Sequence, residues 1–247
     1  MINIATDLDG TIYIDNKLIP GVAEVYKRLI NKGVNVYFIT NNSSQSPNVI
    51  KSKLENLLDS DIEEENIITP LLIFKTYFQN KQKKYYAHGS EALINFLIKE
   101  NYNVVNLENC EIILIGRKEY IDNIEVQKII IEITKGKKVY CFNRDISFPS
   151  DGKELPGNGA VVKIIEDELG ILIDSFGKPD SLYLKYFNDN NIKLDYVVGD
   201  RVDTDIYLGN KLNSTSILVD SGVVNFASDK NADFKLNSFS EIESVVF

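Results

Sequence analysis

The first forty residues alternate between two hydrophobic periods, and this alternation restricts the possible folds more than any other feature. Residues 2–8 (INIATDL) and 34–40 (VNVYFIT) are short apolar runs of the kind found in strands. Between them, in residues 21–33 (GVAEVYKRLINKG), apolar side chains recur at helical spacing and the pattern stops at Gly33. A strand, a helix and a second strand of these lengths normally join parallel neighbours through a right-handed crossover. The opening segment therefore predicts a βαβ unit.

The C-terminal part of the chain repeats the same alternation of helical and strand-like segments. Residues 179–191 and 204–213 have helical periodicity, and each is followed by a short apolar run, at 195–200 and at 215–220. Because parallel strands with helical crossovers need helices on both faces, the two ends together predict one doubly wound, Rossmann-like α/β sheet.

The middle of the chain carries a second alternating series. Strands are expected at 83–89, 111–116 and 137–143, and helices at 90–101, 122–136 and 159–170. This series is complete in itself, so we expect a separate α/β domain inserted at 76–174. Residues 1–75 and 175–247 then form a discontinuous core domain.

Composition excludes several classes of protein. The net charge of −9 argues against nucleic acid as a partner. No apolar run reaches the ~18 residues of a membrane span, and the first ten residues lack the basic and apolar regions of a signal peptide. We therefore expect a cytoplasmic protein that binds neither membrane nor nucleic acid.

The cysteine and histidine content restricts the chemistry further. Cys110 and Cys141 lie far apart and outside any CxxC spacing, so we expect buried free thiols and no cysteine zinc site. The single histidine, His88, cannot supply a histidine-rich metal site, and lone histidines are more often structural than catalytic. General acid–base chemistry must then depend mainly on carboxylates.

Four segments follow predicted strands, where ligands bind in open parallel sheets. They are DLDGT at 7–11, TNNSS at 40–44, GKP at 177–179 and GDRVDTD at 199–205. They would bring aspartates, small hydroxyl and amide donors and one lysine into a single crevice. This combination suits a phosphate group and a hard divalent cation, because Mg²⁺ commonly bridges carboxylates to a substrate phosphate.

The first of these segments suggests the reaction. In an extended strand Asp7 and Asp9 would share a face and repel each other unless a cation lies between them. A carboxylate beside Mg²⁺ can attack phosphorus, while Lys178 and the TNNSS donors stabilise the transferred group. Ser46 before Pro47 predicts a helix start whose free N–H groups face an anion.

Simpler interpretations exist for each motif alone. DLDG is compatible with a solvated turn, and DRVDTD with an acidic start of a helix. The chain has no GxxxxGK[ST] loop, and PGNGA at 156–160 is a weak phosphate-binding signal by itself.

The ordered set DLDGT, TNN, GKP and GDRVDTDI resembles the four motifs of the haloacid dehalogenase superfamily. The large insertion, together with TNNSS and PGNG, resembles its NagD and nitrophenylphosphatase branch. The resemblance implies a Mg²⁺-dependent phosphatase in which Asp7 is the nucleophile and Asp9 the general acid and base. Because dehalogenase members lack an aspartate at the second position, Asp9 favours phosphoryl chemistry over carbon–halogen cleavage.

The same resemblance assigns the remaining site residues. The Mg²⁺ ligands would be Asp7, the backbone carbonyl of Asp9, and Asp200, with Asp205 behind them. The phosphoryl oxygens would be bound by Thr40, Asn41, Asn42 and Lys178.

The inserted domain departs from its relatives, and the identity of the substrate stays open. Relatives usually read Asn-Pro-Asp where this chain has Asn143, Arg144 and Asp145, which we take as candidate substrate contacts. Arg117, Lys118 and Arg144 are candidates for a second anionic group, or are simply exposed charges. Expected substrates are nucleotides, sugar phosphates, phosphoglycolate or nitrophenyl phosphate.

Two other functions fit parts of the pattern. One is a phosphomutase or phosphotransferase of the same superfamily, and the other is a non-enzymatic receiver-like phospho-switch. Among macromolecular partners, only a homo-oligomer formed through the inserted domain is considered.

Overall fold

The computed structural model describes residues 1–150, 153–222 and 231–247, and the chain divides into two compact units. Unit 1 comprises residues 1–40, 47–68 and 184–247, and unit 2 comprises residues 41–46 and 69–183. These units are defined by backbone contacts; the domain limits at 76 and 174 stay a prediction.

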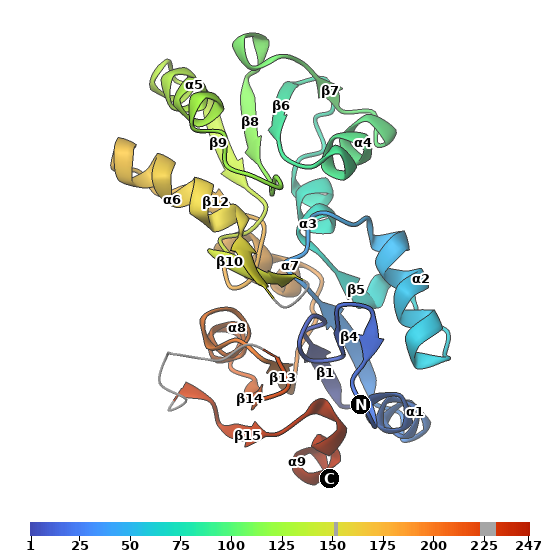
Figure 1. Ribbon diagram of the computed structural model, residues 1–247. Helices are drawn as coiled ribbons and strands as arrows, with labels where there is room; N and C mark the ends of the chain where they lie inside the picture. Colours follow the sequence, from blue (N-terminus) through green and yellow to red (C-terminus); the bar gives the residue numbers. More distant parts are fainter. Residues whose placement is uncertain (151–152, 223–230) are drawn as a thin grey trace. The chain divides into compact units, whose positions relative to one another are not determined.

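Unit 1 contains a parallel sheet (Figure 1), which in the described part of the chain has six strands in the order β15-β14-β13-β1-β4-β5. Their bounds are β1 (Asn3–Thr6), β4 (Asn35–Ile39), β5 (Ile67–Ile68), β13 (Tyr196–Gly199), β14 (Thr215–Val219) and β15 (Phe234–Leu236). In the register, Ile4 of β1 lies opposite Val36 of β4 and Tyr196 of β13. The first strand is therefore central, as a doubly wound fold requires.

Helices cover both faces of this sheet. They are α1 (Val22–Asn31), α2 (Pro47–Leu58), α8 (Tyr207–Lys211) and α9 (Glu243–Val246), together with the non-α helical turns η1 (Glu64–Asn66), η3 (Val202–Ile206) and η5 (Phe239–Glu241). Leu29 of α1 and Leu54 of α2 pack in the main core with Phe38 of β4. On the opposite face Gly209 of α8 approaches Val197 of β13. The predicted α/β fold is confirmed, and α2 begins at Pro47 as expected.

Unit 2 contains its own parallel sheet, with the strand order β12-β9-β8-β6-β7 among the residues described. Its strands are β6 (Lys84–His88), β7 (Asn103–Val104), β8 (Ile112–Ile115), β9 (Lys138–Cys141) and β12 (Asp174–Ser175), and an antiparallel hairpin is formed by β10 (Ser147–Ser150) and β11 (Lys153–Pro156). The helices are α3 (Pro70–Tyr77), η2 (Leu107–Asn109), α4 (Glu91–Lys99), α5 (Asn123–Thr134) and α6 (Asn158–Leu169). The chain passes from unit 2 to unit 1 within α7 (Ser181–Asp189).

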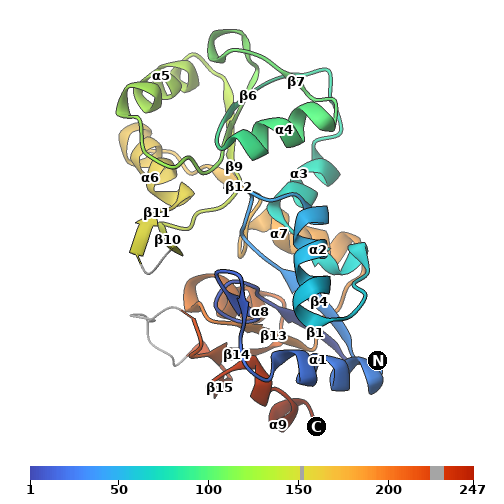
Figure 2. The same ribbon diagram turned by 45° about the vertical axis from the view of Figure 1, so that its right-hand side comes forward.

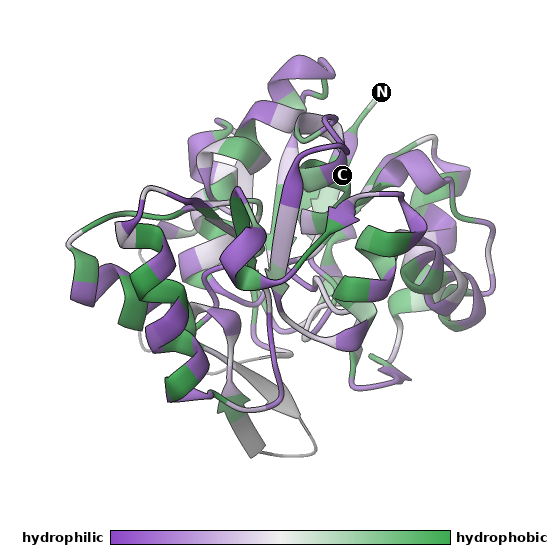
Figure 3. Cartoon of the chain, turned by 90° about the horizontal axis from the view of Figure 1, so that it is seen from above, coloured by the Kyte–Doolittle hydropathy of each residue, from purple (hydrophilic) through white to green (hydrophobic). Residues whose placement is uncertain are grey.

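The two faces of the unit 2 sheet are packed differently. Figure 2 shows α4 and α5 on either side of β6. Ile115 packs in an aliphatic cluster with Ile129 of α5 and Ile165 of α6. A separate, aromatic cluster in the same unit is centred on Phe74 of α3. It contains Tyr85, Tyr102, Phe142 and Phe176. In Figure 3 the helices show green and purple bands, because apolar and polar residues recur along them at helical spacing.

Two further expectations can be compared with the structure. Cys110 and Cys141 are buried free thiols, which confirms the prediction. In the three described ranges, no helix has both the length and the apolar character needed to cross a membrane.

The end of the first strand differs from the expectation. Strand β1 ends at Thr6, so the strand alternation invoked for Asp7 and Asp9 does not apply to them. The chain turns instead at Gly10, whose φ of +90° favours glycine and whose N–H donates to the Tyr13 carbonyl at 2.7 Å. A short hairpin of β2 (Tyr13–Ile14) and β3 (Lys17–Leu18) follows.

Candidate active site

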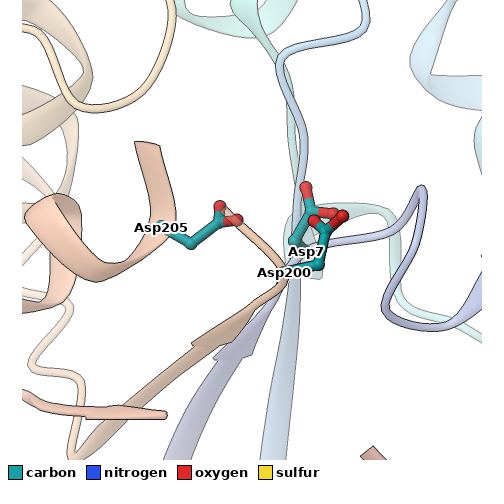
Figure 4. A group of neighbouring side chains, drawn as sticks. All are labelled: Asp7, Asp200 and Asp205. Carbon is teal, nitrogen blue, oxygen red and sulfur yellow. The ribbon is translucent and has the colours of Figure 1, made fainter. Parts of the chain in front are cut away.

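Two aspartates leave the sheet of unit 1 at adjacent points. Asp7 follows β1 and Asp200 follows β13, and these strands are paired in register through Thr6 and Val198. The Asp7 N–H continues the ladder by donating to the Val198 carbonyl at 2.8 Å. Figure 4 shows the two carboxyl groups close together above the strand ends. Both side chains are buried, so neighbouring parallel strands set their separation.

A third carboxylate reaches the same place from η3. Asp205 is fully buried, and its Oδ2 accepts a hydrogen bond from the Arg201 backbone N–H at 3.1 Å. A Cβ at position 199 would lie 2.2 Å from the Asp205 Cγ, so only glycine leaves room for this side chain. Asp7, Asp200 and Asp205 each place a carboxylate oxygen within 4.8 Å of the others.

This cluster fits a hard divalent cation. Three buried carboxylates carry formal negative charges that repel one another, and oxygen donors are the ligands that Mg²⁺ prefers. A Cβ at Gly10 or Gly222 would lie 2.4 Å or 1.9 Å from Asp200 Oδ2. The chain therefore keeps side chains out of the space beside this carboxylate.

Asp9 lies outside the cluster, on the turn after β1. Its side chain is exposed, and its backbone forms an isolated bridge with Tyr13. Burial raises the pKa of Tyr13 far above its ordinary value, and the charges of Asp9 and Asp7 raise it further, so Tyr13 stays a protonated donor.

The predicted phosphate-binding residues occur in both units. Thr40 follows β4 in unit 1, is buried, and donates its N–H to the Ile68 carbonyl at 3.2 Å. In unit 2, the Asn41 side chain accepts from the Lys178 N–H at 2.6 Å and donates to the Lys178 carbonyl at 3.1 Å. Asn42 accepts from the Ser44 N–H and hydroxyl at 2.9 Å and 2.7 Å. The Asn41 amide thus fixes the backbone that carries the predicted phosphate-binding lysine.

Two of the predicted substrate contacts join the same network. Asn143 donates its side-chain N–H to the Asn41 carbonyl at 2.8 Å, and Asn41 donates to Asp145 Oδ1 at 2.9 Å. Glycines of the PGNG motif allow the 143–145 segment to pack closely: a Cβ at Gly157 or Gly159 would lie 2.1 Å from a carbonyl oxygen of that segment. In this structure the motif therefore serves backbone packing.

Arg144 forms structural contacts within unit 2. Its guanidinium donates to both Glu166 carboxylate oxygens, at 2.8 Å and 2.6 Å, and to the Ile173 carbonyl at 2.8 Å. Roles for Asn143, Arg144 and Asp145 in substrate recognition stay a prediction.

We expect Arg144→Ala to lower the free energy of unfolding by about 1–3 kcal/mol, because it removes a two-pronged, half-buried ion pair and leaves Glu166 without its counter-charge. The matched control is Lys163→Ala on α6, the helix that carries Glu166; its exposed pair with Asp167 should contribute less than about 0.5 kcal/mol. Urea unfolding followed by circular dichroism measures both. Equal midpoints for the two variants would contradict the structural role of Arg144.

His88 takes part in a separate network. It is fully buried in unit 2, with Nδ1 2.9 Å from Glu125 Oε1. Burial lowers the pKa of His88 despite the neighbouring Glu125 carboxylate. Glu125 also accepts from the Tyr86 hydroxyl at 2.6 Å and from Lys118 Nζ at 2.5 Å. The histidine thus contacts a glutamate that also accepts hydrogen bonds from two other donors, as expected of a structural residue.

Comparisons with known proteins agree with this architecture. Family models of the haloacid dehalogenase-like hydrolases and of HAD-hydrolase-like proteins match residues 4–103 and 175–241, together more than half of the chain. An acid sugar phosphatase of Staphylococcus haemolyticus is 29% identical over 233 residues, which cover 92% of this chain and 88% of that protein.

Two further relatives are named for different activities. The 5'-nucleotidase YutF of Bacillus subtilis is 29% identical, over 88% of this chain and 86% of its own length. The 4-nitrophenylphosphatase of Thermotoga maritima superposes with a TM-score of 0.84 at 26% identity, over 99% of this chain and 97% of that one.

A doubly wound sheet, a buried aspartate cluster at its carboxyl edge and these matches define the class: the chain belongs to the haloacid dehalogenase superfamily of hydrolases. Within that superfamily it lies in the phosphatase branch of NagD and the nitrophenylphosphatases. The family predicted from the four motifs is confirmed.

Proposed function

We propose that this protein is a Mg²⁺-dependent phosphatase that hydrolyses small phosphomonoesters through an aspartyl-phosphate intermediate. The observation that carries the proposal is the cluster of Asp7, Asp200 and Asp205, with Asp9 two residues after its first member. One carboxylate is available for attack and another for proton transfer, and the buried cluster as a whole can hold a cation.

In this proposal, as the family resemblance implies, the metal ligands are Asp7, Asp200 and the backbone carbonyl of Asp9. Asp205 supports the site from the opposite side, with its Oδ2 held by the Arg201 N–H. Bound there, Mg²⁺ would offset the charge of the carboxylates and orient a phosphate dianion among them.

In the first half-reaction a carboxylate oxygen of Asp7 forms a bond to phosphorus while the bond from phosphorus to the leaving oxygen breaks. The electron pair of that bond goes to the leaving oxygen. Asp9, in its carboxylic acid form, gives that oxygen a proton and becomes a carboxylate. The alcohol departs, and the phosphoryl group remains on Asp7.

In the second half-reaction Asp9 takes a proton from water, and the water oxygen attacks phosphorus. The bond between phosphorus and the Asp7 oxygen breaks, which regenerates the Asp7 carboxylate and releases inorganic phosphate. Asp9 ends as the carboxylic acid with which it began. Thr40, Asn41, Asn42 and Lys178 bind the phosphoryl oxygens in both steps.

Sugar phosphates and nucleoside monophosphates are the proposed substrate classes. They are the classes named for the relatives of this chain, an acid sugar phosphatase and a 5'-nucleotidase. Nitrophenyl phosphate serves as a chromogenic substrate. A panel of these esters and phosphoglycolate, assayed for phosphate release over many turnovers, tests the function. Isomerised sugar phosphate in place of free phosphate would identify a mutase, and a single turnover would identify a phospho-switch.

Metal dependence gives a direct prediction. EDTA should remove activity and Mg²⁺ should restore it, while Ca²⁺ should restore it poorly because its longer, looser coordination misplaces the nucleophile. Asp200→Ala should raise the half-saturating Mg²⁺ concentration by at least about tenfold, since it removes a buried ligand.

The control for this experiment is Asp220→Ala, which removes an exposed carboxylate paired with Lys235. Calorimetric titration of Mg²⁺ into each variant measures affinity independently of turnover. A parental Mg²⁺ affinity in Asp200→Ala would contradict the assigned metal site.

A further inference from the structure

Three segments of unit 2 meet at the side chain of Asn41. They are residues 41–46, residues 142–145 after β9, and residues 177–178 after β12. A Cβ at Gly177 would lie 2.8 Å from Asn41 Oδ1 and 2.9 Å from a backbone carbonyl oxygen of the second segment. The three segments can therefore approach one another this closely only because position 177 is a glycine. Asn41 itself is buried among them.

The Asn41 amide uses both of its N–H groups within unit 2. Its Nδ2 donates to Asp145 Oδ1 at 2.9 Å and to the Lys178 carbonyl at 3.1 Å, and its Oδ1 accepts from the Lys178 N–H at 2.6 Å. Exchanging the amide oxygen and nitrogen would place an acceptor against the Asp145 carboxylate, so a single orientation satisfies all three contacts. Since an asparagine amide has two N–H donors, none is left for a phosphoryl oxygen.

The contact with Lys178 fixes both polar groups of its backbone. Asn41 accepts from the N–H and donates to the carbonyl of the same residue, as a residue of a neighbouring strand would. The lysine is 2% exposed, and its ammonium sits at the end of a flexible four-carbon stem. The position of that ammonium therefore depends on where the Asn41 amide holds the backbone.

Asn143 and Asp145 hold Asn41 in turn. The Asp145 carboxylate binds the Asn41 N–H more strongly than a neutral acceptor would. Asn143 Nδ2 donates to the Asn41 carbonyl at 2.8 Å, and its Oδ1 accepts from the Asp145 N–H at 3.2 Å. Asn158 of α6 donates to the Asn143 carbonyl at 2.8 Å. The side chain and the backbone of Asn41 are thus both held by a segment that is itself bonded to α6.

We propose that Asn143 and Asp145 are positioning residues for Lys178, acting through the Asn41 amide, and are not contacts for the leaving group of the substrate. The inference rests on the proposed function, because it takes Lys178 to bind the phosphoryl group. It leaves phosphate binding by Asn41 to its backbone N–H. A carboxylate is a good acceptor for an amide but repels a phosphate dianion, which agrees with this role for Asp145.

The two roles predict different kinetics. Every substrate presents a phosphoryl group to Lys178, whereas substrates differ in their leaving groups. Asp145→Ala should therefore lower kcat/KM by the same factor for a sugar phosphate and for nitrophenyl phosphate. We expect a factor of about ten to a hundred, the cost of a small misplacement at a reacting centre, and the same pattern for Asn143→Ala. A loss confined to the sugar phosphate, or no loss on either substrate, would overturn the proposal.

Inorganic phosphate has no leaving group, so it tests the phosphate site alone. Its dissociation constant, measured by calorimetric titration in the presence of Mg²⁺, should rise by about tenfold in Asp145→Ala, the usual cost of losing a hydrogen bond to a charged group. An unchanged constant would show that Asp145 does not act on the phosphate site.

A conservative variant and a matched control separate positioning from general stability. Asp145→Asn keeps an oxygen that accepts from Asn41, so its kcat/KM should stay within about threefold of the parent value. Asp122→Ala removes the carboxylate that caps α5 in the same unit. It should lower the melting temperature without changing kcat/KM. Equal losses of kcat/KM in Asp122→Ala and Asp145→Ala would show a merely structural role and overturn the proposal.

A double-mutant cycle tests whether the effect passes through Lys178. In the Lys178→Met background, Asp145→Ala should cost less than about twofold more, because the group that it positions is gone. Additive losses would show that Asp145 acts independently of Lys178 and would overturn this inference while leaving the proposed function intact. Full activity of Lys178→Met alone would overturn the proposed role of Lys178 and this inference with it, so the two failures are distinguishable.

Discussion

Asp7→Asn is expected to lower phosphate release from every substrate by more than about 10⁴-fold while the protein stays folded. The amide has the same shape as the carboxylate but lacks the charge that attacks phosphorus. The fold should tolerate it, because the ladder contact of this residue uses its backbone N–H to Val198 and not its side chain. Long incubations with nitrophenyl phosphate measure the residual rate, and thermal unfolding tests integrity.

Asp15→Asn is the matched control for this variant. Asp15 lies on the same segment, is exposed, and has a positive φ of 54°, which asparagine adopts readily. Its activity should equal that of the parent. Retained turnover in an Asp7→Asn sample that mass spectrometry shows to be free of deamidated protein would contradict the nucleophile assignment.

Asp9→Asn is expected to have the second largest effect, a loss of about 10²–10⁴-fold on sugar phosphates, the range typical of general acid–base groups. The loss should be smaller on nitrophenyl phosphate, which needs little protonation of its leaving group. Asp203→Asn is the control, since Asp203 is an exposed carboxylate of the fourth motif that pairs with Arg201. The same loss across leaving groups would show that Asp9 acts in another way.

Regular periodicity made most of the fold predictable. The helix expected at 122–136 is α5 (Asn123–Thr134), and its predicted start coincides with Asp122, whose carboxylate accepts from the Ile124 N–H at 2.9 Å. The strands expected at 111–116 and 195–200 are β8 and β13. These elements were predictable because helix and strand patterning are local properties of the sequence.

Features that depend on distant packing were not predictable. The end of β1 at Thr6 follows from the turn at Gly10, and the two-residue strands β2 and β3 are too short for any periodic signal. The resemblance placed Asp205 behind the metal ligands, but its position within 4.8 Å of Asp7 depends on η3 and on the glycine at position 199.

Lys53 illustrates the same limit. On the sequence it is one of several charged residues of an ordinary amphipathic helix, and only the tertiary structure places its ammonium over Tyr13. The available signal was Tyr13, two residues after DLDGT, because a buried tyrosine ring usually needs a polar contact for its hydroxyl.

The central position of β1 has a consequence for how the protein is made. One neighbour, β4, leaves the ribosome soon after β1, but the other, β13, is encoded about 190 residues later. At typical translation speeds of roughly 5–20 residues per second, the edge of β1 that pairs with β13 stays unpaired for about ten to forty seconds during synthesis. Asp200 becomes a neighbour of Asp7 only when β13 pairs with β1. Cation binding by the aspartate cluster would thus report that synthesis and closure of the sheet are complete, and an N-terminal fragment should lack it.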